Sequence, residues 1–264
     1  MVPAKQRPLV SVVIPHRGDD TPLEKCVTAL RSQTYPRQDT EILIVLNEKS
    51  ERSVSFPLEP GEKLLREPQA FSYAARNHGI LHAKGQLIAL TDSDTVPSAE
   101  WLAEGVAALG GRADMVAGRI DLTFTRHPLT PAACYEKLFS FDQEKNVSLG
   151  RATTANLFLH KTTFTQLGLF ATEAQSGEDF AWTIRAAHAG SSLKYSASAI
   201  VFHPARERWK ELFEKATRKT EPMTRVSSTR EGARLSFSRM KARYLTSPSR
   251  GRADDMSAGQ LFLA

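Results

Sequence analysis

Two aspartates separated by one serine follow an apolar run in the stretch LIALTDSDTVP, Leu87 to Pro97. An apolar run of that length predicts a buried strand, so Asp92-Ser93-Asp94 lies where the strand ends. Two carboxylates at such a place have two chemical uses. They can bind a divalent metal together with a nucleotide. Alternatively, Asp92 can act as a phosphate-accepting nucleophile, with Asp94 as its acid and base.

Three further groups of polar residues stand where predicted elements begin or end. His16-Arg-Gly-Asp-Asp20 follows the first apolar strand, Glu178-Asp179 opens a helix, and His203 ends a late strand. In an open α/β sheet such ends converge on one crevice. Taken alone, each group has a simpler explanation. The acidic triplet could be a turn or a helix cap, Glu178-Asp179 could compensate a helix dipole, and His203 could be structural. That all of these groups occur in one chain, in this order, favours a ligand-binding or catalytic site.

These residue types together suit a reaction in which a diphosphate leaves. Asp94 and His203 could share a Mn²⁺ or Mg²⁺ ion, with diphosphate oxygens and water as its other ligands. Asp92 could accept hydrogen bonds from ribose hydroxyls, and Arg76, on the preceding helix, could pair with the diphosphate. Asp179 or the glutamate before it could then deprotonate an acceptor hydroxyl.

The first 110 residues alternate predicted strands with predicted helices. The expected strands are 10–14, 41–46, 63–66 and 86–91, and the expected helices begin at Thr21, Phe71 and Ser98. Thr21 is the expected cap of the first helix, with Pro22 at its first position. Short connections between such elements predict a parallel sheet with helices on both faces.

The second half of the chain is less regular. We expect strands at 115–124, 156–160 and 199–203, and helices at 131–144, 178–188 and 206–220. The predicted organisation is one domain over residues 1–220, with a nucleotide-binding half (1–110) and an acceptor-binding half (111–220). A basic, helical C-terminal extension (221–264) follows. The fold class is α/β, with a mostly parallel, Rossmann-like central sheet.

Charge is distributed unevenly along the chain, whose formal net charge is +6. Residues 205–264 hold 14 Lys and Arg against seven Asp and Glu, so the basic excess lies there. Such a segment is either a solvated helix or a contact for anionic lipid or a phosphorylated substrate. Aromatic residues are not interleaved with the cations, so no nucleic-acid partner is expected.

The apolar segments predict the location of the protein. No run approaches 18 apolar residues, and the N-terminal MVPAKQRPLV contains no apolar targeting core. We therefore expect a cytoplasmic protein, with at most peripheral membrane contact through the basic C-terminus. Cys26 and Cys134 are too few for a disulfide framework or zinc cluster and are expected in the core.

Six segments in order resemble the family 2 glycosyltransferases of the GT-A fold, over roughly residues 9–215. They are VSVVIPHRGDD, then LEKCVTALRSQTYP with EILIVLN, AARNHGILHAKGQLIALTDSDTVPSAEWL, NLFLHKTTFTQLGLF, SGEDFAWTIRAAHAG and IVFH. The resemblance implies a nucleotide-sugar donor, such as a UDP-sugar or another nucleoside diphosphate sugar. It also implies a divalent metal and inversion at the anomeric carbon.

By position in these motifs, the resemblance implies a role for each polar residue. Asp94 is the metal-binding acid of the DxD motif, and His203 completes the metal site. Asp179 is the catalytic base of the ED motif, with Glu178 beside it. The remaining residues would contact the donor: Pro15, His16, Arg17, Arg76, Asp92 and Ser93.

The chain departs from the family pattern in three places. Asn47 stands where many members have an acidic residue that contacts the base. Asn47 could still bond a base edge of the donor, but its weaker acceptor role leaves uracil specificity open. His16-Arg17 replaces the usual pair after the first strand. Arg208-Trp209 survives from the Gln-x-x-Arg-Trp motif of processive synthases, but Ala205 stands in place of the glutamine. We therefore expect transfer of a single sugar, in cell-envelope, polysaccharide or glycoconjugate synthesis.

The acceptor is the least determined part of this prediction. It could be a glycan, a lipid-linked molecule or a small molecule, bound by residues 125–175 and the basic C-terminus. Trp182, one turn after Asp179, could stack on a sugar or belong to the core. Two other functions stay open: a phosphatase of the haloacid-dehalogenase type with Asp92 as nucleophile, and a non-catalytic nucleotide-binding relative.

Overall fold

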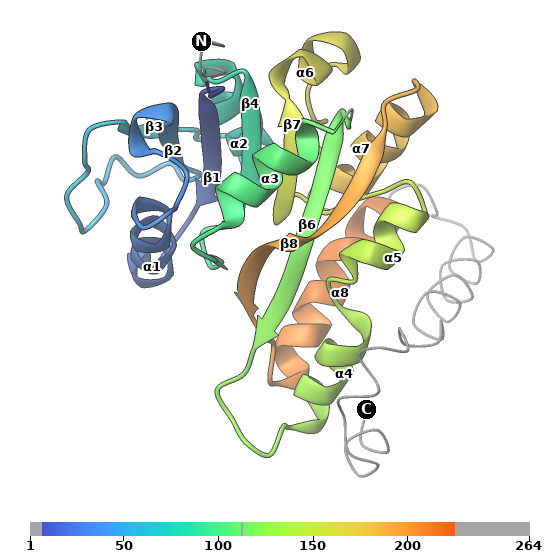
Figure 1. The fold of residues 1–264 in the computed structure, drawn as a ribbon. Helices are drawn as coiled ribbons and strands as arrows, with labels where there is room; N and C mark the ends of the chain where they lie inside the picture. The colour runs from blue at the N-terminus through green and yellow to red at the C-terminus, as the bar shows by residue number, and fades with distance from the viewer. Residues whose placement is uncertain (1–6, 112, 225–264) are drawn as a thin grey trace, which may run out of the picture.

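The computed structural model describes residues 7–111 and 113–224, and most of the expected C-terminal extension lies outside them. Through them runs an eight-stranded sheet in the order β3-β2-β1-β4-β7-β6-β8-β5 (Figure 1). The strands are β1 (Val10–His16), β2 (Thr40–Leu46), β3 (Glu62–Arg66), β4 (Leu87–Thr91), β5 (Val96–Pro97), β6 (Met115–Thr123), β7 (Asn156–His160) and β8 (Leu193–Pro204).

Most neighbouring strands of the sheet are parallel, as expected. β3, β2, β1 and β4 pair in parallel, and so do β6 and β8. β7 is antiparallel to β4 and β6, and β5 is antiparallel to β8. Because β7 joins the first four strands to β6 and β8, both halves of the chain contribute to one continuous sheet.

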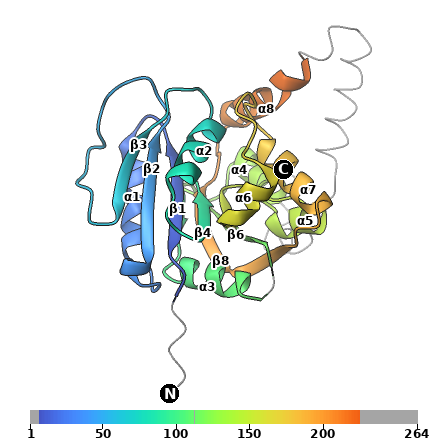
Figure 2. The same cartoon turned by 90° about the horizontal axis from the view of Figure 1, so that it is seen from above.

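Helices cover both faces of the sheet (Figure 2). The core on one face contains α1 (Asp20–Arg31) and α3 (Trp101–Leu109). The core on the other face contains α2 (Ser72–His82), α6 (Lys161–Leu167) and α7 (Glu178–His188). Val12 and Ile14 face the first set of helices while Val13 faces the second, because side chains alternate along a strand. The predicted α/β class is therefore confirmed.

The remaining helices differ in part from the sequence expectations. The segment expected as one helix over 131–144 forms α4 (Pro131–Phe139) and α5 (Gln143–Ser148). Phe141, between them, has φ of 56°, a left-handed conformation that interrupts a helix. α8 spans Trp209–Thr224, and a short 3₁₀ helix spans Arg37–Asp39. Asp19, rather than Thr21, caps α1, since its carboxylate accepts the Thr21 N–H at 3.1 Å.

A β-bulge between β6 and β8 directs the end of β8. The register shifts between Gly118 and Arg119 of β6. A Cβ on Gly118 would lie 2.3 Å from the Ala199 oxygen, so the two strands approach too closely there for any other residue. Asn156 of β7 spans the bulge, and its amide donates to the oxygens of Arg119 (2.8 Å) and Ala199 (2.9 Å).

Both cysteines lie in the core, as expected. Burial raises the pKa of Cys26 to about 12, so its thiol stays protonated at neutral pH. No helix among residues 7–111 and 113–224 is both long and apolar enough to cross a bilayer.

Candidate active site

The acidic triplet forms a tight turn between β4 and β5. Thr95 donates both its N–H (3.2 Å) and its hydroxyl (2.8 Å) to the Asp92 carbonyl oxygen. With the backbone held in this way, the Asp92 and Asp94 side chains stay 30% and 42% exposed. Ser93 between them is half-buried. The turn therefore presents both carboxylates to a ligand.

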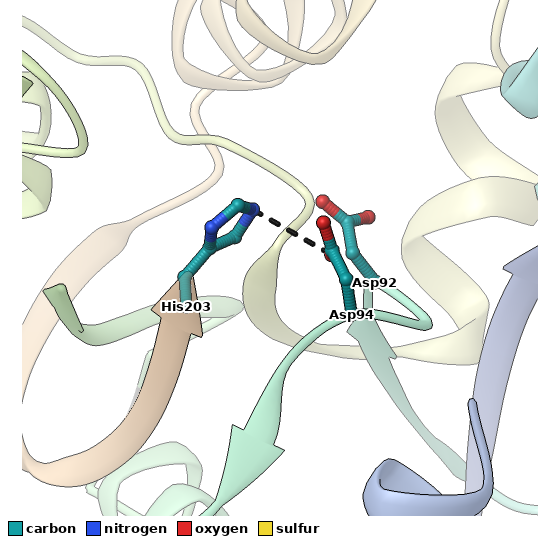
Figure 3. A group of neighbouring side chains, drawn as sticks. All are labelled: Asp92, Asp94 and His203. Carbon is teal, nitrogen blue, oxygen red and sulfur yellow. Dashed lines mark ion pairs between the residues drawn. The ribbon is translucent and has the colours of Figure 1, made fainter. Parts of the chain in front are cut away.

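Pairing between β5 and β8 brings His203 to this turn. Val96 of β5 pairs with Phe202 of β8, so the residue after Phe202 comes close to the residue two before Val96. His203 Nε2 lies 3.6 Å from Asp94 Oδ1. One ligand atom each from Asp92, Asp94 and His203 lie within 4.8 Å of one another, and the three side chains point toward a common space (Figure 3).

The orientation of the His203 ring suits metal binding. Nδ1 lies 2.8 Å from the Pro204 carbonyl oxygen, which can only accept, so Nδ1 carries the proton. When the ring is neutral, Nε2, which faces Asp94, is then the nitrogen with a free lone pair that a metal ion needs. The Phe141 ring covers the imidazole at 4.4 Å between centroids. Two carboxylates and one imidazole fit an ion such as Mn²⁺ or Mg²⁺.

Arg76, for which the resemblance implies a donor-site role, joins α2 to the acidic triplet. Its Nη2 donates to Asp92 Oδ1, and its Nη1 donates to Ser72 Oγ at 2.9 Å. The arginine is 4% exposed, so the ion pair is largely shielded from water. It supplies a fixed positive charge beside the predicted diphosphate position.

Asp179 and Glu178, at the start of α7, have different surroundings. The Glu178 side chain is 7% exposed, and its Oε1 accepts from the Ala171 N–H (3.0 Å) and from Arg185 (2.9 Å). This glutamate therefore holds the preceding loop, and a catalytic role for it is not supported. Asp179 is half-buried and accepts a hydrogen bond from the Tyr73 hydroxyl at 3.2 Å.

The end of β1 and the loop after it contribute to a polar network. Pro15 and His16 are buried, whereas Arg17 is exposed. His16 Nε2 contacts Asp20 at 2.9 Å, and Arg52 donates to the same carboxylate at 2.7 Å. Burial opposes ionisation of Asp20, but the hydrogen bonds from Arg52 and His16 outweigh it and lower the pKa of Asp20 to about 2. His16 is therefore committed to this network, which shapes the expected nucleotide-facing loop.

The structure limits one expected ligand contact and contradicts another. The Asn47 side-chain N–H groups donate to the backbone oxygens of Glu67 (3.1 Å) and Gln69 (2.6 Å), so only the Asn47 Oδ1 could contact a base. Trp182 is fully buried, its ring packs against Phe164 and Phe170, and its indole N–H donates to a backbone oxygen. The prediction that Trp182 stacks on an acceptor sugar was therefore wrong, because its side of α7 faces the core.

Sequence reasoning did not identify three residues that shape the site: Tyr73, Phe141 and Arg52. Tyr73 lies three residues before Arg76, which puts both on one side of a helix, and this spacing could have indicated it. Arg52 and Phe141 lie in loops, and no local pattern in the sequence indicates their contacts.

Comparison with known proteins identifies the family. The family model described as Glycosyl transferase family 2 matches residues 11–154, more than half of the chain. The glycosyltransferase AglE of Haloferax volcanii is 35% identical over 207 residues, 75% of this chain and 68% of AglE. The probable glycosyltransferase YdaM of Bacillus subtilis is 24% identical over 233 residues, and the chain spans 55% of its length.

Solved structures share the fold. The mannosyltransferase PcManGT from Pyrobaculum calidifontis, in complex with GDP-Man and Mn²⁺, superposes with a TM-score of 0.62 at 15% identity. The similarity covers 98% of this chain and 79% of that one. TarS of S. aureus gives a TM-score of 0.55 at 13% identity, over 74% of this chain and 36% of TarS. The chain thus belongs to glycosyltransferase family 2, and it is a glycosyltransferase of the GT-A fold.

Proposed function

We propose that this enzyme transfers a single sugar, with inversion, from a nucleoside diphosphate sugar to an acceptor hydroxyl. The observation that carries the proposal is the convergence of Asp92, Asp94 and His203 within 4.8 Å, with Arg76 paired to Asp92. The donor complex of PcManGT, which contains GDP-Man and Mn²⁺, supports a nucleotide-sugar donor and a divalent ion here.

The proposed reaction is a direct displacement at the anomeric carbon. The acceptor oxygen forms a bond to C1 while the bond between C1 and the diphosphate oxygen breaks. Asp179 takes the proton of the acceptor hydroxyl, and Arg76 stabilises the negative charge that develops on the diphosphate. Asp94 and His203, with Asp92 beside them, would hold a Mn²⁺ or Mg²⁺ ion, which when bound neutralises charge on a leaving diphosphate.

The proposed acceptor is defined only as a broad chemical class. A hollow of about 210 Å³ is lined by Thr125, Arg126, Ala205, Glu207, Arg208 and Glu211. Two arginines and two glutamates offset one another in this lining, so the hollow suits a polar acceptor, such as a glycan or a lipid-linked sugar, without selecting its charge. We also propose cytoplasmic action, with peripheral membrane contact through the basic C-terminus, most of which lies outside the described residues.

Family membership argues against the phosphatase alternative. The triplet lies inside the segment that matches the glycosyltransferase model. The Asp92 carboxylate is paired with Arg76, which suits a fixed acceptor of hydrogen bonds better than a phosphate-accepting nucleophile. The same family membership argues against the non-catalytic alternative, because the matched family and its relatives are glycosyltransferases.

The direct test measures release of nucleoside diphosphate from a panel of nucleotide sugars, with Mn²⁺ and candidate acceptors. We expect turnover with at least one donor, and its loss with EDTA or in Asp94→Ala. Asp39→Ala is the matched control, because Asp39 is a half-buried aspartate at the opposite, amino-terminal end of β2. If no donor in the full panel is consumed by the wild-type enzyme, the proposal is wrong.

A second experiment distinguishes the roles of Asp179 and Glu178 at the start of α7. Asp179→Asn should lower kcat by roughly 10²- to 10⁴-fold, as expected for loss of a general base, while donor binding is retained. Glu178→Gln should act mainly on stability, because this side chain binds Ala171 and Arg185. Initial rates, calorimetric donor binding and melting temperatures would measure these effects. Near wild-type turnover in Asp179→Asn would contradict the base assignment.

A further inference from the structure

The hydroxyl of Tyr73, a 5% exposed residue of α2, lies against the start of α7. It contacts the N–H groups of Gly177 (3.1 Å) and Asp179 (3.3 Å) and the Asp179 Oδ1 atom (3.2 Å). A phenol has one hydrogen and two lone pairs. Because both N–H groups must donate, they use the lone pairs, and the phenolic hydrogen goes to the carboxylate.

The local sequence explains why α7 needs this contact. Gly177, the N-cap residue, has φ of +87° and no side chain to cap the helix. The first N–H groups of a helix have no partner within it and must find one elsewhere. The Tyr73 hydroxyl, from a different helix, accepts from two N–H groups at this terminus. The Gly177 and Asp179 N–H groups are therefore bonded to α2, whereas the next one, of Phe180, donates to Asp179 Oδ1 at 2.9 Å.

The Tyr73 ring connects this contact to the donor side of the site. The Arg76 guanidinium carbon lies 5.6 Å from the ring centroid, and Phe170 packs against the ring at 5.7 Å. Arg76, one turn further along α2, binds Asp92. Two neighbouring side chains of one helix thus bind the proposed base at one end and the acidic triplet at the other.

The hydroxyl is a permanent donor under physiological conditions. Burial, and then the negative charge of Asp179, raise the pKa of Tyr73 well above its usual range. The phenol therefore stays protonated at neutral pH and can donate to the Asp179 carboxylate.

We propose that Tyr73 is a positioning residue for sugar transfer. It fixes the Asp179 carboxylate and the start of α7 relative to Arg76 and the acidic triplet. This inference rests on the proposed function, in which Asp179 accepts the proton of the acceptor hydroxyl. It goes further by assigning a role to a residue outside the acidic motifs.

The test compares two tyrosine-to-phenylalanine variants. Tyr73→Phe removes the hydroxyl but keeps the ring against Arg76 and Phe170. Tyr35→Phe is the matched control, because Tyr35 is also buried (6% exposed) and donates to a backbone oxygen, that of Pro8, at 2.6 Å. Both variants should melt at similar, slightly lower temperatures, and both should be assayed below their melting transitions.

We expect Tyr73→Phe to lower kcat about 10- to 100-fold, the scale of a hydrogen bond to a charged group. Donor affinity, measured by calorimetry, should not change, because the hydroxyl contacts only α7. Tyr35→Phe should keep the wild-type kcat. A positioning role acts through the base, so adding Tyr73→Phe to Asp179→Asn should cost little more.

The outcomes separate this inference from the proposal on which it rests. Equal kcat values for the two phenylalanine variants, in an enzyme that transfers sugar, would overturn the role of Tyr73 alone. So would a full additional loss in the double variant. Absence of transfer by the wild-type enzyme with every donor would instead overturn the proposed function.

Discussion

Asp20 keeps its negative charge in a largely buried position beside the loop after β1. Its partners are Arg52, His16 and the Ser55 N–H. These contacts lower its pKa to about 2, against about 3.9 in an unfolded chain. Because the unfolded state binds the proton more tightly, the contribution to stability is complete above about pH 4 and disappears as pH falls toward 2.

We therefore predict that Asp20→Asn lowers the free energy of unfolding near neutral pH by on the order of 2 kcal/mol. The difference from wild type should stay constant from pH 7 to about pH 5 and shrink as the pH falls below 4. Urea titrations at a series of pH values would measure it. A difference that stayed the same down to pH 3 would show that the ionised carboxylate is not the stabilising form.

At the residue scale, the sequence predicts which polar residues lie at the ends of strands and helices. It does not predict which contacts those residues make. Asp94 and His203 follow apolar strands, so their meeting at one edge of the sheet could be expected, and it is observed. Trp182 follows Asp179 by one turn, but only the tertiary structure shows that Phe164 and Phe170 cover it. Asn47 likewise bonds to a loop twenty residues away in sequence.

At the element scale, the bulge between β6 and β8 determines where β8 ends. Gly118→Ala would place a Cβ 2.3 Å from the Ala199 oxygen and 2.4 Å from Asn156 Nδ2. Backbone and a buried amide cannot move aside without breaking the bonds that Asn156 makes across the bulge. We expect a loss of about 1–3 kcal/mol in stability, the range for overpacking, with weaker Mn²⁺ binding because His203 is displaced.

The matched control for this prediction is Gly111→Ala. A Cβ there would meet the Ala108 oxygen at 3.5 Å, an ordinary contact at an exposed helix end. Thermal unfolding and Mn²⁺ titration of the two variants would measure both effects. If Gly118→Ala matched Gly111→Ala in stability and in metal affinity, the bulge would not be the feature that places His203.

The elements that the sequence predicts well are the apolar ones. β1, β2, β4 and β7 appear where β-branched and leucine-rich runs stand, within one residue of the expected bounds at most ends. β5 has two residues and includes a proline, and the first half of β8 is largely exposed, so neither has a strong pattern. These two strands nevertheless bring His203 to Asp94. The sequence therefore predicts that the two residues lie at one edge of the sheet, but the strand pairing that places them 3.6 Å apart is seen only in the structure.

At the scale of the whole molecule, the site joins the two halves of one sheet. Asp92 and Asp94 follow β4, whereas His203 lies at the far end of β8, more than a hundred residues later. A ligand that contacts both halves of the sheet links them, and this link exists only in the folded state. Binding of metal and nucleotide should therefore stabilise the fold as a unit rather than one half of it.

We predict that Mn²⁺ and the preferred nucleoside diphosphate raise the melting temperature together by more than the sum of their separate effects. Each ligand that binds only the folded state stabilises it by about 2.7 kcal/mol at 100 times its Kd. For a chain of this size that is a shift of roughly 5–10 °C. We expect this excess because, in the proposed site, a bound diphosphate would supply oxygen ligands to an ion held by Asp94 and His203.

Differential scanning fluorimetry with Mn²⁺, with each nucleoside diphosphate, and with both together would measure this excess. In Asp94→Ala the excess should vanish, because the metal loses a carboxylate ligand, while Asp39→Ala should behave as wild type. The nucleotide that gives the largest shift also reports the base preference, to which Asn47 could contribute only through its Oδ1 because its N–H groups bind backbone oxygens. Strictly additive shifts in the wild-type protein would mean that metal and nucleotide bind independently, contrary to a shared site at Asp94 and His203.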